Sequence, residues 1–247
     1  MRIPLLVSLF LWLAAACAGG DDSLVYARRA QALLGSGVWS QVLRIENHSG
    51  VSPYPRTVHA LVFELAGILW FYTDLDGTQS FSLHRGRLAE EKANFEPLLR
   101  DIDPGFQRWT EVAADLKATQ AHAVGAELRN GCFIESYVAL RRLVARGEAV
   151  TAPRLLSYYP KHSRHGVGHT VLAYANAGQV VVIDPLRPDV KLGFPASLAV
   201  DPKKLAEAVQ GQVVENARVL PLALPIGSGQ REIYAANETA RSSVVPH

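Results

Sequence analysis

Cys132 is the residue of this chain best suited to nucleophilic chemistry. It lies in the stretch RNGCFIESY, and the other cysteine, Cys17, lies close to the N-terminus. A thiol becomes a strong nucleophile when it ionises, and both a helix N-terminus and a nearby imidazolium favour the thiolate. Cys132 is therefore a candidate nucleophile, with a buried core cysteine and half of a disulfide as the alternatives.

A helix that starts at Cys132 would provide the first of these two influences. The apolar side chains after the cysteine recur with the period of one α-helical face: Phe133, Tyr137, Leu140 and Val144. Asn130 can cap the start of this helix, and Gly147 can end it. The pattern therefore predicts that Cys132 lies in the first helical turn.

A histidine and an aspartate occupy matched positions of a predicted hairpin. GHTVLAY and QVVVIDP read as two strands joined by a four-residue loop, 175–178. In the register set by this loop, Tyr174 pairs with Gln179 and His169 pairs with Asp184. Directly opposed residues share a face, with Cβ atoms about 4.5–5.5 Å apart, so we expect the imidazole and the carboxylate to meet. An Asp-Pro turn beside an edge histidine is the alternative.

Together the three residues have the types needed for acyl transfer. Cys132 would attack a carbonyl carbon, His169 would transfer the proton, and Asp184 would orient the imidazole and stabilise its charged form. This interpretation requires the helix to pack on the sheet with its N-terminus near His169. A structural cysteine remains the alternative for Cys132.

The order of Cys132, His169 and Asp184 resembles the transglutaminase-like core of papain-fold enzymes. GCFIESYVALRRL is similar to its cysteine helix, GHTVLAY to its histidine strand and QVVVIDP to its aspartate strand. The resemblance covers about residues 125–190 and is strongest to the bacterial transglutaminase-like cysteine peptidases. Double-glycine-type cysteine peptidases have a similar GH…DP ending but a longer spacing from cysteine to histidine.

This resemblance implies an α+β fold in which the cysteine helix packs on an antiparallel sheet. It implies Cys132 as nucleophile, His169 as general base and Asp184 as the third member of a triad. The expected substrate is a peptide or protein amide, and no cofactor is expected. Many relatives have a carboxylate or polar residue directly after the cysteine, whereas this chain has Phe133 and Ile134. A catalytically silent papain-fold protein of the cell envelope, used for binding or scaffolding, is the alternative from another class.

Residue types indicate two further candidate sites. Gln120 and the main-chain N–H of Cys132 are candidates for an oxyanion hole, although an ordinary surface glutamine is the favoured interpretation of Gln120. His162, His165 and His169 lie close together in KHSRHGVGH and could be combined with Asp184 as metal ligands. Their spacing and the glycines between them favour a solvated basic loop, so we expect no metal.

The N-terminus reads as an export signal. A positive charge precedes an apolar run at residues 5–16, which is too short to span a membrane. Cleavage before Gly19 would remove Cys17, whereas the lipobox-like residues 13–17 would make Cys17 the lipidation site of a bacterial lipoprotein. Either route leaves Cys132 without a disulfide partner in an oxidising compartment, so we expect an exported protein with no membrane contact except a lipid anchor at Cys17.

Composition excludes some classes of protein. The 247 residues are 49% hydrophobic, which is enough to bury a core, and the net charge is only +2 with both signs dispersed. No basic block indicates nucleic-acid binding. The sequence therefore predicts a globular enzyme or binding protein.

The domain organisation follows from local patterns. Residues 1–17 are the signal, 24–118 an N-terminal α/β region, 119–225 the transglutaminase-like core and 226–247 a flexible tail. In the N-terminal region we expect a helix at 24–35, a strand or helical turn at 38–45, a β-meander at 57–83 and helices at 87–100 and 106–127. In the core we expect strands at 155–159 and 218–224 and a helix at 201–210.

Overall fold

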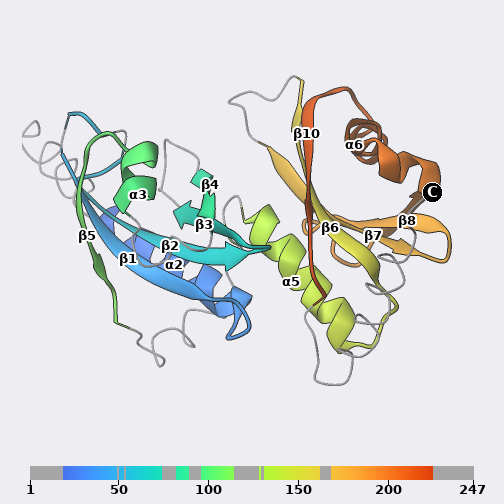
Figure 1. The fold of residues 1–247 in the computed structure, drawn as a ribbon, viewed down its shortest axis with the longest axis horizontal. Coiled ribbons are helices and arrows are strands. Elements are labelled where there is room, and N and C mark those ends of the chain that lie inside the picture. Colours follow the sequence, from blue (N-terminus) through green and yellow to red (C-terminus); the bar gives the residue numbers. More distant parts are fainter. Residues whose placement is uncertain are drawn as a thin grey trace, which may run out of the picture.

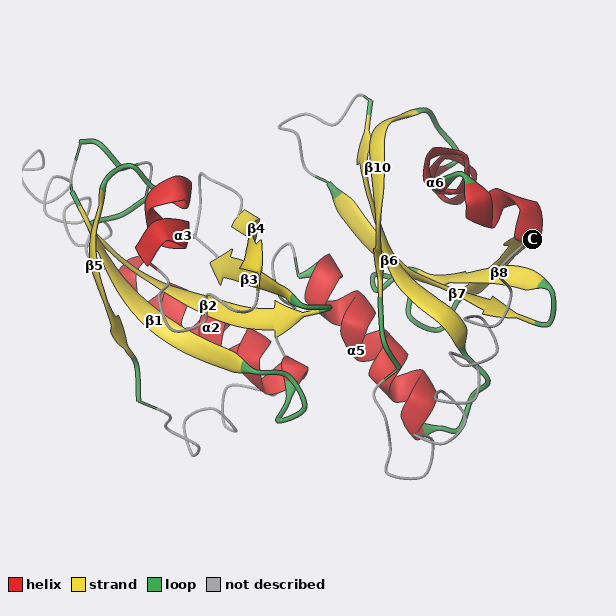
Figure 2. Cartoon of the chain, viewed as in Figure 1, coloured by secondary structure: helices red, strands yellow, loops and turns green. Residues whose placement is uncertain are grey.

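Two five-stranded antiparallel sheets and four α-helices make up most of what the computed structural model describes, so the expected α+β class is confirmed (Figures 1 and 2). No helix in this described part is long and apolar enough to cross a membrane. The residues described are 19–48, 50–52, 54–73, 82–88, 96–113, 128, 131–161 and 168–224.

The N-terminal sheet has the strand order β4-β3-β2-β1-β5. Its strands are β1 (Ser40–Asn47), β2 (Thr57–Leu65), β3 (Ile68–Thr73), β4 (Ser82–Leu88) and β5 (Phe106–Glu111). The predicted meander is present, and its first turn falls at Ala66 and Gly67, both with positive φ. Strand β4 includes the end of the meander predicted at 57–83, and residues 74–81 lie outside the described part.

Two predicted helices of this region are wrong at the residues that the structure describes. Residues 87–88 end strand β4 and Glu96–Ile102 form helix α3, whereas residues 89–95 of the helix expected at 87–100 lie outside the described residues. Residues 114–127 of the helix expected at 106–127 also lie outside them. Residues 106–111 form edge strand β5 instead of a helix, because they pair with β1. Only Phe106 of this strand is buried, so its sequence lacks a clear strand pattern and the pairing decides its conformation.

The C-terminal sheet has the strand order β10-β6-β7-β8-β9. Its strands are β6 (Thr151–Pro160), β7 (His169–Asn176), β8 (Gln179–Ile183), β9 (Lys191–Pro195) and β10 (Val214–Pro221). The predicted strands and the helix, α6 (Pro202–Gln210), are confirmed, whereas β9 and the short 3-10 helix Ala196–Val200 were not expected. Asp201 caps α6 by accepting the main-chain N–H groups of Lys203 and Lys204.

Helices α2 (Gly19–Leu34) and α5 (Cys132–Ala145) lie between the two sheets. One apolar cluster contains residues of both helices and of the facing side of each sheet. Phe133 at the start of α5 packs against Trp70 of β3, with ring centroids 4.4 Å apart. The Arg141 guanidinium donates to the carbonyls of Leu33 and Leu34 and so caps α2 from α5. The N-terminal sheet therefore helps to hold the helix that carries Cys132.

The outer faces of the sheets have their own cores. Leu99 of α3 packs on one side of the N-terminal sheet, and Leu205 of α6 packs on the C-terminal sheet with Val171 and Val182. The apolar clusters place the layers in the order α3, first sheet, α2 and α5, second sheet, α6, and Figure 1 shows α5 between the two sheets. Sheet β6-β7-β8 is thus buried on both faces, as its nearly continuous apolar strands predict.

The β7–β8 hairpin has a shorter loop than the sequence predicted. Asn176 pairs with Gln179, so the turn contains only Ala177 and Gly178, with φ of 47° and 77°. Two positive φ values are typical of a type I′ turn, which matches the right-handed twist of the strands. The expected four-residue loop at 175–178 is therefore wrong, and the register of the hairpin is displaced by two residues.

This turn offers a test of the backbone geometry. Ala177→Asn should raise the free energy of unfolding by about 0.5–1 kcal/mol, because asparagine tolerates a positive φ better than alanine. Urea unfolding followed by circular dichroism measures the change. Ala149→Asn is the matched control, because Ala149 is exposed and does not have a positive φ. Its free energy of unfolding should change little. A loss of stability in Ala177→Asn would contradict the turn type.

Candidate active site

His169 and Asp184 form a hydrogen-bonded pair at the end of the hairpin. His169 Nε2 lies 3.0 Å from Asp184 Oδ1, and their side chains are 18% and 13% exposed. The predicted contact is therefore present although the predicted register is wrong. A displacement of two residues leaves both side chains on the same face, and the pair becomes a diagonal neighbour pair instead of a directly opposed one.

The loop after β8 fixes the Asp184 carboxylate. Oδ1 also accepts the Leu186 main-chain N–H at 2.9 Å, and the Arg187 guanidinium lies 3.7 Å from Oδ2. With an ionised carboxylate, Nε2 of His169 carries the proton and donates it to Oδ1. Nδ1 is then the ring nitrogen left to accept a proton from another group.

Tyr158 supports His169 from the neighbouring strand. The two residues are paired in the β6–β7 ladder, and their rings meet edge to face with centroids 5.7 Å apart. The Tyr158 hydroxyl donates to Gln210 Oε1 at 3.1 Å. Burial, followed by the nearby charges of Asp184 and Cys132, raises the pKa of Tyr158, so it remains a neutral phenol. Tyr158 was not among the residues predicted from the sequence, although a correct β6–β7 register would have placed it beside His169.

Helix α5 begins at Cys132, as predicted. Gly131 is its N-cap residue and provides no side-chain cap. A Cβ at Gly131 would lie 2.2 Å from Cβ of Leu128, so the chain needs a glycine to approach Leu128 directly before the helix. Asn130, the expected cap, lies outside the described residues. The first main-chain N–H groups of a helix have no partner within it and can face an anion.

The Cys132 thiol is partly exposed and forms no disulfide. Burial raises the pKa of the thiol above its ordinary value, and this effect exceeds the lowering by hydrogen bonds from Thr170 and the Phe133 main chain. The expected lowering of the pKa is therefore wrong for this structure, because desolvation outweighs the donors at the helix start. The thiol is protonated at neutral pH.

Thr170 joins α5 to the sheet. Ser136, one helical turn after Cys132, donates from its hydroxyl to the Thr170 carbonyl at 3.0 Å, and the Thr170 and Ser157 hydroxyls lie 2.9 Å apart. The β7–β8 ladder begins only at Leu172, so the start of α5 takes the place of a strand beside Thr170. No motif in the sequence indicated this role for Thr170, because its partners are distant along the chain.

Cys132 and His169 lie on different sides of β7. Leu172 belongs to the core beside α5 and Val171 to the core beside α6, so Thr170 faces α5 while His169 faces α6. The Cys132 sulfur forms no hydrogen bond with the His169 ring, and both residues lie in the described part of the chain. The structure therefore brings His169 and Asp184 together and places Cys132 beside Thr170, the next residue of the strand.

The remaining candidate residues lie outside the part of the chain that the structure describes. Gln120, Cys17, His162 and His165 are not among the described residues. Within the described ranges, no group of three or more His, Cys, Asp or Glu side chains is placed to hold a metal ion.

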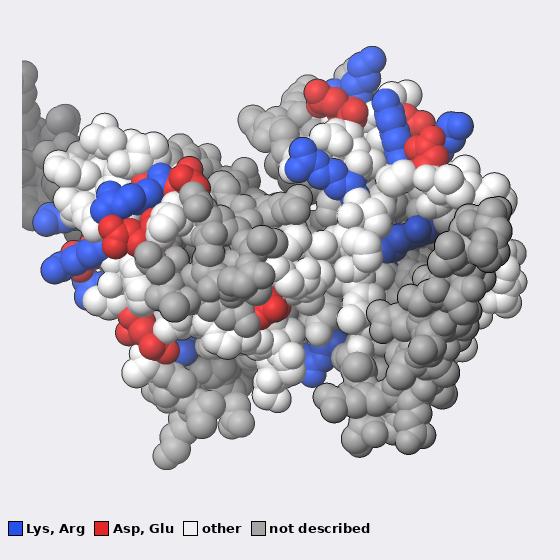
Figure 3. Space-filling model, viewed as in Figure 1, with Lys and Arg blue, Asp and Glu red and all other residues white. Residues whose placement is uncertain are grey.

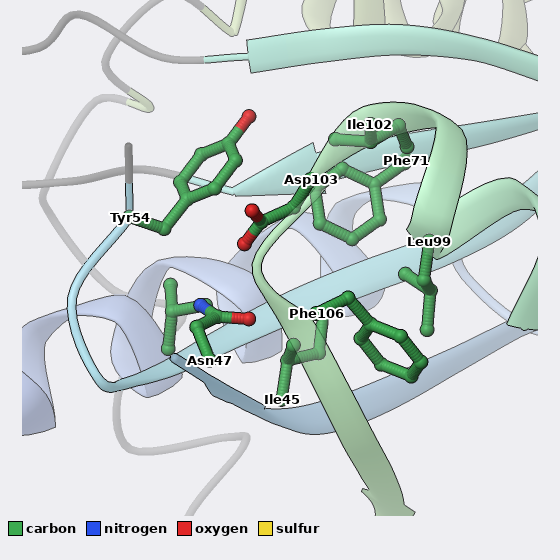
Figure 4. A pocket seen from close by; sticks show the side chains of 9 residues that line it. Ile45, Asn47, Tyr54, Phe71, Leu99, Ile102, Asp103 and Phe106 are labelled. Atoms are coloured by element: carbon green, nitrogen blue, oxygen red, sulfur yellow. The ribbon is translucent and has the colours of Figure 1, made fainter. Parts of the chain in front are cut away.

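A small cavity lies in the N-terminal sheet region, away from these residues. Side chains of α3 and the strands meet around it, among them Phe71, Leu99 and Phe106 (Figure 4). None of Cys132, His169 and Asp184 lines it.

Lys, Arg, Asp and Glu side chains are interspersed on the face shown in Figure 3. Neither the cavity nor the charges indicate another site, so the candidate active site is the region at the start of α5, the start of β7 and the end of β8.

No protein-family model, no curated protein and no solved structure matches the chain.

Proposed function

We propose that this protein is an exported cysteine hydrolase or acyltransferase that acts on an amide bond of a peptide or protein. The observation that carries the proposal is the His169–Asp184 pair together with a helix that starts at Cys132, whose thiol lies against Thr170, the residue after His169. A nucleophile at a helix start, a base and a group that orients the base are the parts that such chemistry needs. Their order along the chain also supports a papain-like fold with a transglutaminase-like core.

The reaction would start from a protonated thiol. As the Cys132 sulfur attacks the substrate carbonyl, Nδ1 of His169 accepts the thiol proton, and Asp184 stabilises the imidazolium. The imidazolium then protonates the leaving amine, the C–N bond breaks, and a thioester remains on Cys132. Water or a second amine completes the cycle. The main-chain N–H groups at the start of α5 would stabilise the oxyanion.

This sequence of steps requires the His169 ring to turn toward the open edge of β7. His169 is the first residue of the strand, and the β7–β8 ladder begins only at Leu172, so no strand among the described residues pairs with His169 on that edge. Catalytic hydrogen bonds are often absent before substrate binds and form in the complex. Export by the N-terminal signal, with Cys17 as a lipid anchor, is part of the same proposal.

Alkylation of Cys132 tests the proposal. The rate of labelling by iodoacetamide is measured from pH 5 to pH 10 in the wild type and in His169→Ala. We expect His169→Ala to be at least about tenfold slower at pH 7. The difference should shrink at the alkaline end of the range, because the thiol, whose pKa burial raises, needs less help from a base as the pH rises.

Two controls accompany this experiment. Cys132→Ala defines the background labelling, and His48→Ala replaces an exposed histidine of the N-terminal region. Superimposable pH profiles of the wild type and His169→Ala would overturn the proposed function.

A catalytically silent binding protein is the second candidate. The raised pKa of Cys132 and the lack of a hydrogen bond between its sulfur and His169 favour this candidate. In that case Cys132 and Thr170 serve only to join α5 to the sheet. The same experiment separates the two candidate functions, because the labelling rate of a structural thiol does not change when His169 is replaced by alanine.

A further inference from the structure

Tyr159 is an exposed aromatic residue at the edge of the candidate active site. It is 43% exposed, whereas its neighbour Tyr158 is 1% exposed on the opposite face of β6. Side chains alternate along a strand, so Tyr159 shares its face with Ser157 and Leu155. Leu155 packs in the core beside α5. Tyr159 therefore lies on the side of the sheet that carries Cys132.

The start of α5 explains why Tyr159 is open to solvent. The helix begins at the level of the Ser157–Thr170 pair, which lies beside Cys132 and Ser136. Tyr159 is the next residue of β6 on this face after Ser157, and its side chain is 43% exposed. An exposed aromatic ring thus follows directly on the position of the nucleophile along this face.

Gly168 allows the Tyr159 ring to lie across the neighbouring strand. Continuing the β6–β7 register places Gly168 opposite Tyr159, and a Cβ on Gly168 would lie only 2.9 Å from Cε1 of Tyr159. Any larger residue would push the ring away. The glycine next to His169 therefore sets the position of an aromatic surface beside the site.

We propose that Tyr159, lying across Gly168, forms the wall of a subsite that binds an apolar, preferentially aromatic, side chain of the substrate beside Cys132. This inference rests on the proposed function and names its substrate class: peptides with a large apolar residue next to the attacked bond. An aromatic ring offers a large apolar surface and a favoured edge-to-face or offset geometry for a second ring. Tyr159 is thus a specificity residue and takes no part in proton transfer.

Peptidyl chloromethyl ketones that differ in one side chain test the subsite. The Cys132 sulfur displaces chloride, a C–S bond replaces the C–Cl bond, and the thiol proton passes to His169. Rates of labelling are compared for probes with Phe, Ala or Asp next to the reactive carbon. We expect the wild type to react about five- to tenfold faster with the Phe probe than with the Ala probe.

Variants of Tyr159 locate the preference. Tyr159→Ala should lose most of the preference for Phe over Ala, and Tyr159→Phe should keep it. Gly168→Ala should reduce the preference because its Cβ displaces the ring. Val200→Ala, 87% exposed elsewhere on the surface, is the matched control.

The two failures are distinguishable. An equal rate for all three probes, or a preference that survives in Tyr159→Ala, would overturn the subsite. A rate of iodoacetamide labelling that is the same in the wild type and in His169→Ala would instead overturn the proposed function, whatever the side-chain preference.

Discussion

Asp184→Asn is expected to slow acylation of Cys132 at neutral pH by about 10²- to 10⁴-fold. Asp184 Oδ1 accepts the Nε2 proton of His169, which leaves Nδ1 free to take the thiol proton. Oδ1 also accepts the Leu186 N–H, so an asparagine that keeps its oxygen in this position can still accept from Nε2. It carries no charge, however, and therefore cannot stabilise the imidazolium that forms when His169 takes the thiol proton.

The Phe-bearing chloromethyl ketone measures this loss, and circular dichroism checks that the variant is folded. Asp189→Asn is the matched control, because Asp189 is exposed in the same loop. It should react like the wild type. A rate for Asp184→Asn within about threefold of the wild type would show that the charge of the carboxylate does not stabilise the imidazolium of His169.

Leu140→Ala is expected to lower the free energy of unfolding by about 2–5 kcal/mol. Leu140 is 0% exposed in the middle of α5, in the apolar cluster that includes both sheets. Truncation removes apolar contacts and leaves a cavity that neighbours on two sheets cannot easily fill. Because this cluster joins the sheets, we also expect wild type and variant to unfold in a single transition.

Urea unfolding followed by both near- and far-ultraviolet circular dichroism measures these effects. Leu186→Ala makes the same chemical change at a side chain that is 68% exposed, and it should cost less than about 0.5 kcal/mol. Two separate transitions, or a loss below about 1 kcal/mol in Leu140→Ala, would show that α5 does not couple the sheets.

Local periodicity was enough to predict several elements. The 3.6-residue spacing from Phe133 onward predicted a helix that starts at Cys132, and the helix starts there. The pairing of His169 with Asp184 was also predictable, although the loop length was wrong. The period of a strand is two, so an error of two residues in register leaves each side chain on its predicted face.

Edge strands were not predictable in the same way. Residues 106–111 bury one side chain, and β9 (Lys191–Pro195) buries none fully, so neither has the apolar alternation that marks a strand. Their conformation follows from hydrogen bonds to β1 and β8. These partners are far away in the sequence or separated by a loop, and intrinsic propensity does not specify them.

The sequence alone determined which residue types could do the chemistry and on which elements they lie. Only the tertiary structure decided their surroundings: Thr170 beside Cys132, Tyr158 against His169, and sulfur and imidazole on different sides of β7. The tertiary structure also decided the direction of the pKa shift of Cys132, because this shift depends on how much protein surrounds the thiol. Periodicity is set by backbone geometry within a few residues, whereas burial depends on how segments far apart in the chain pack together.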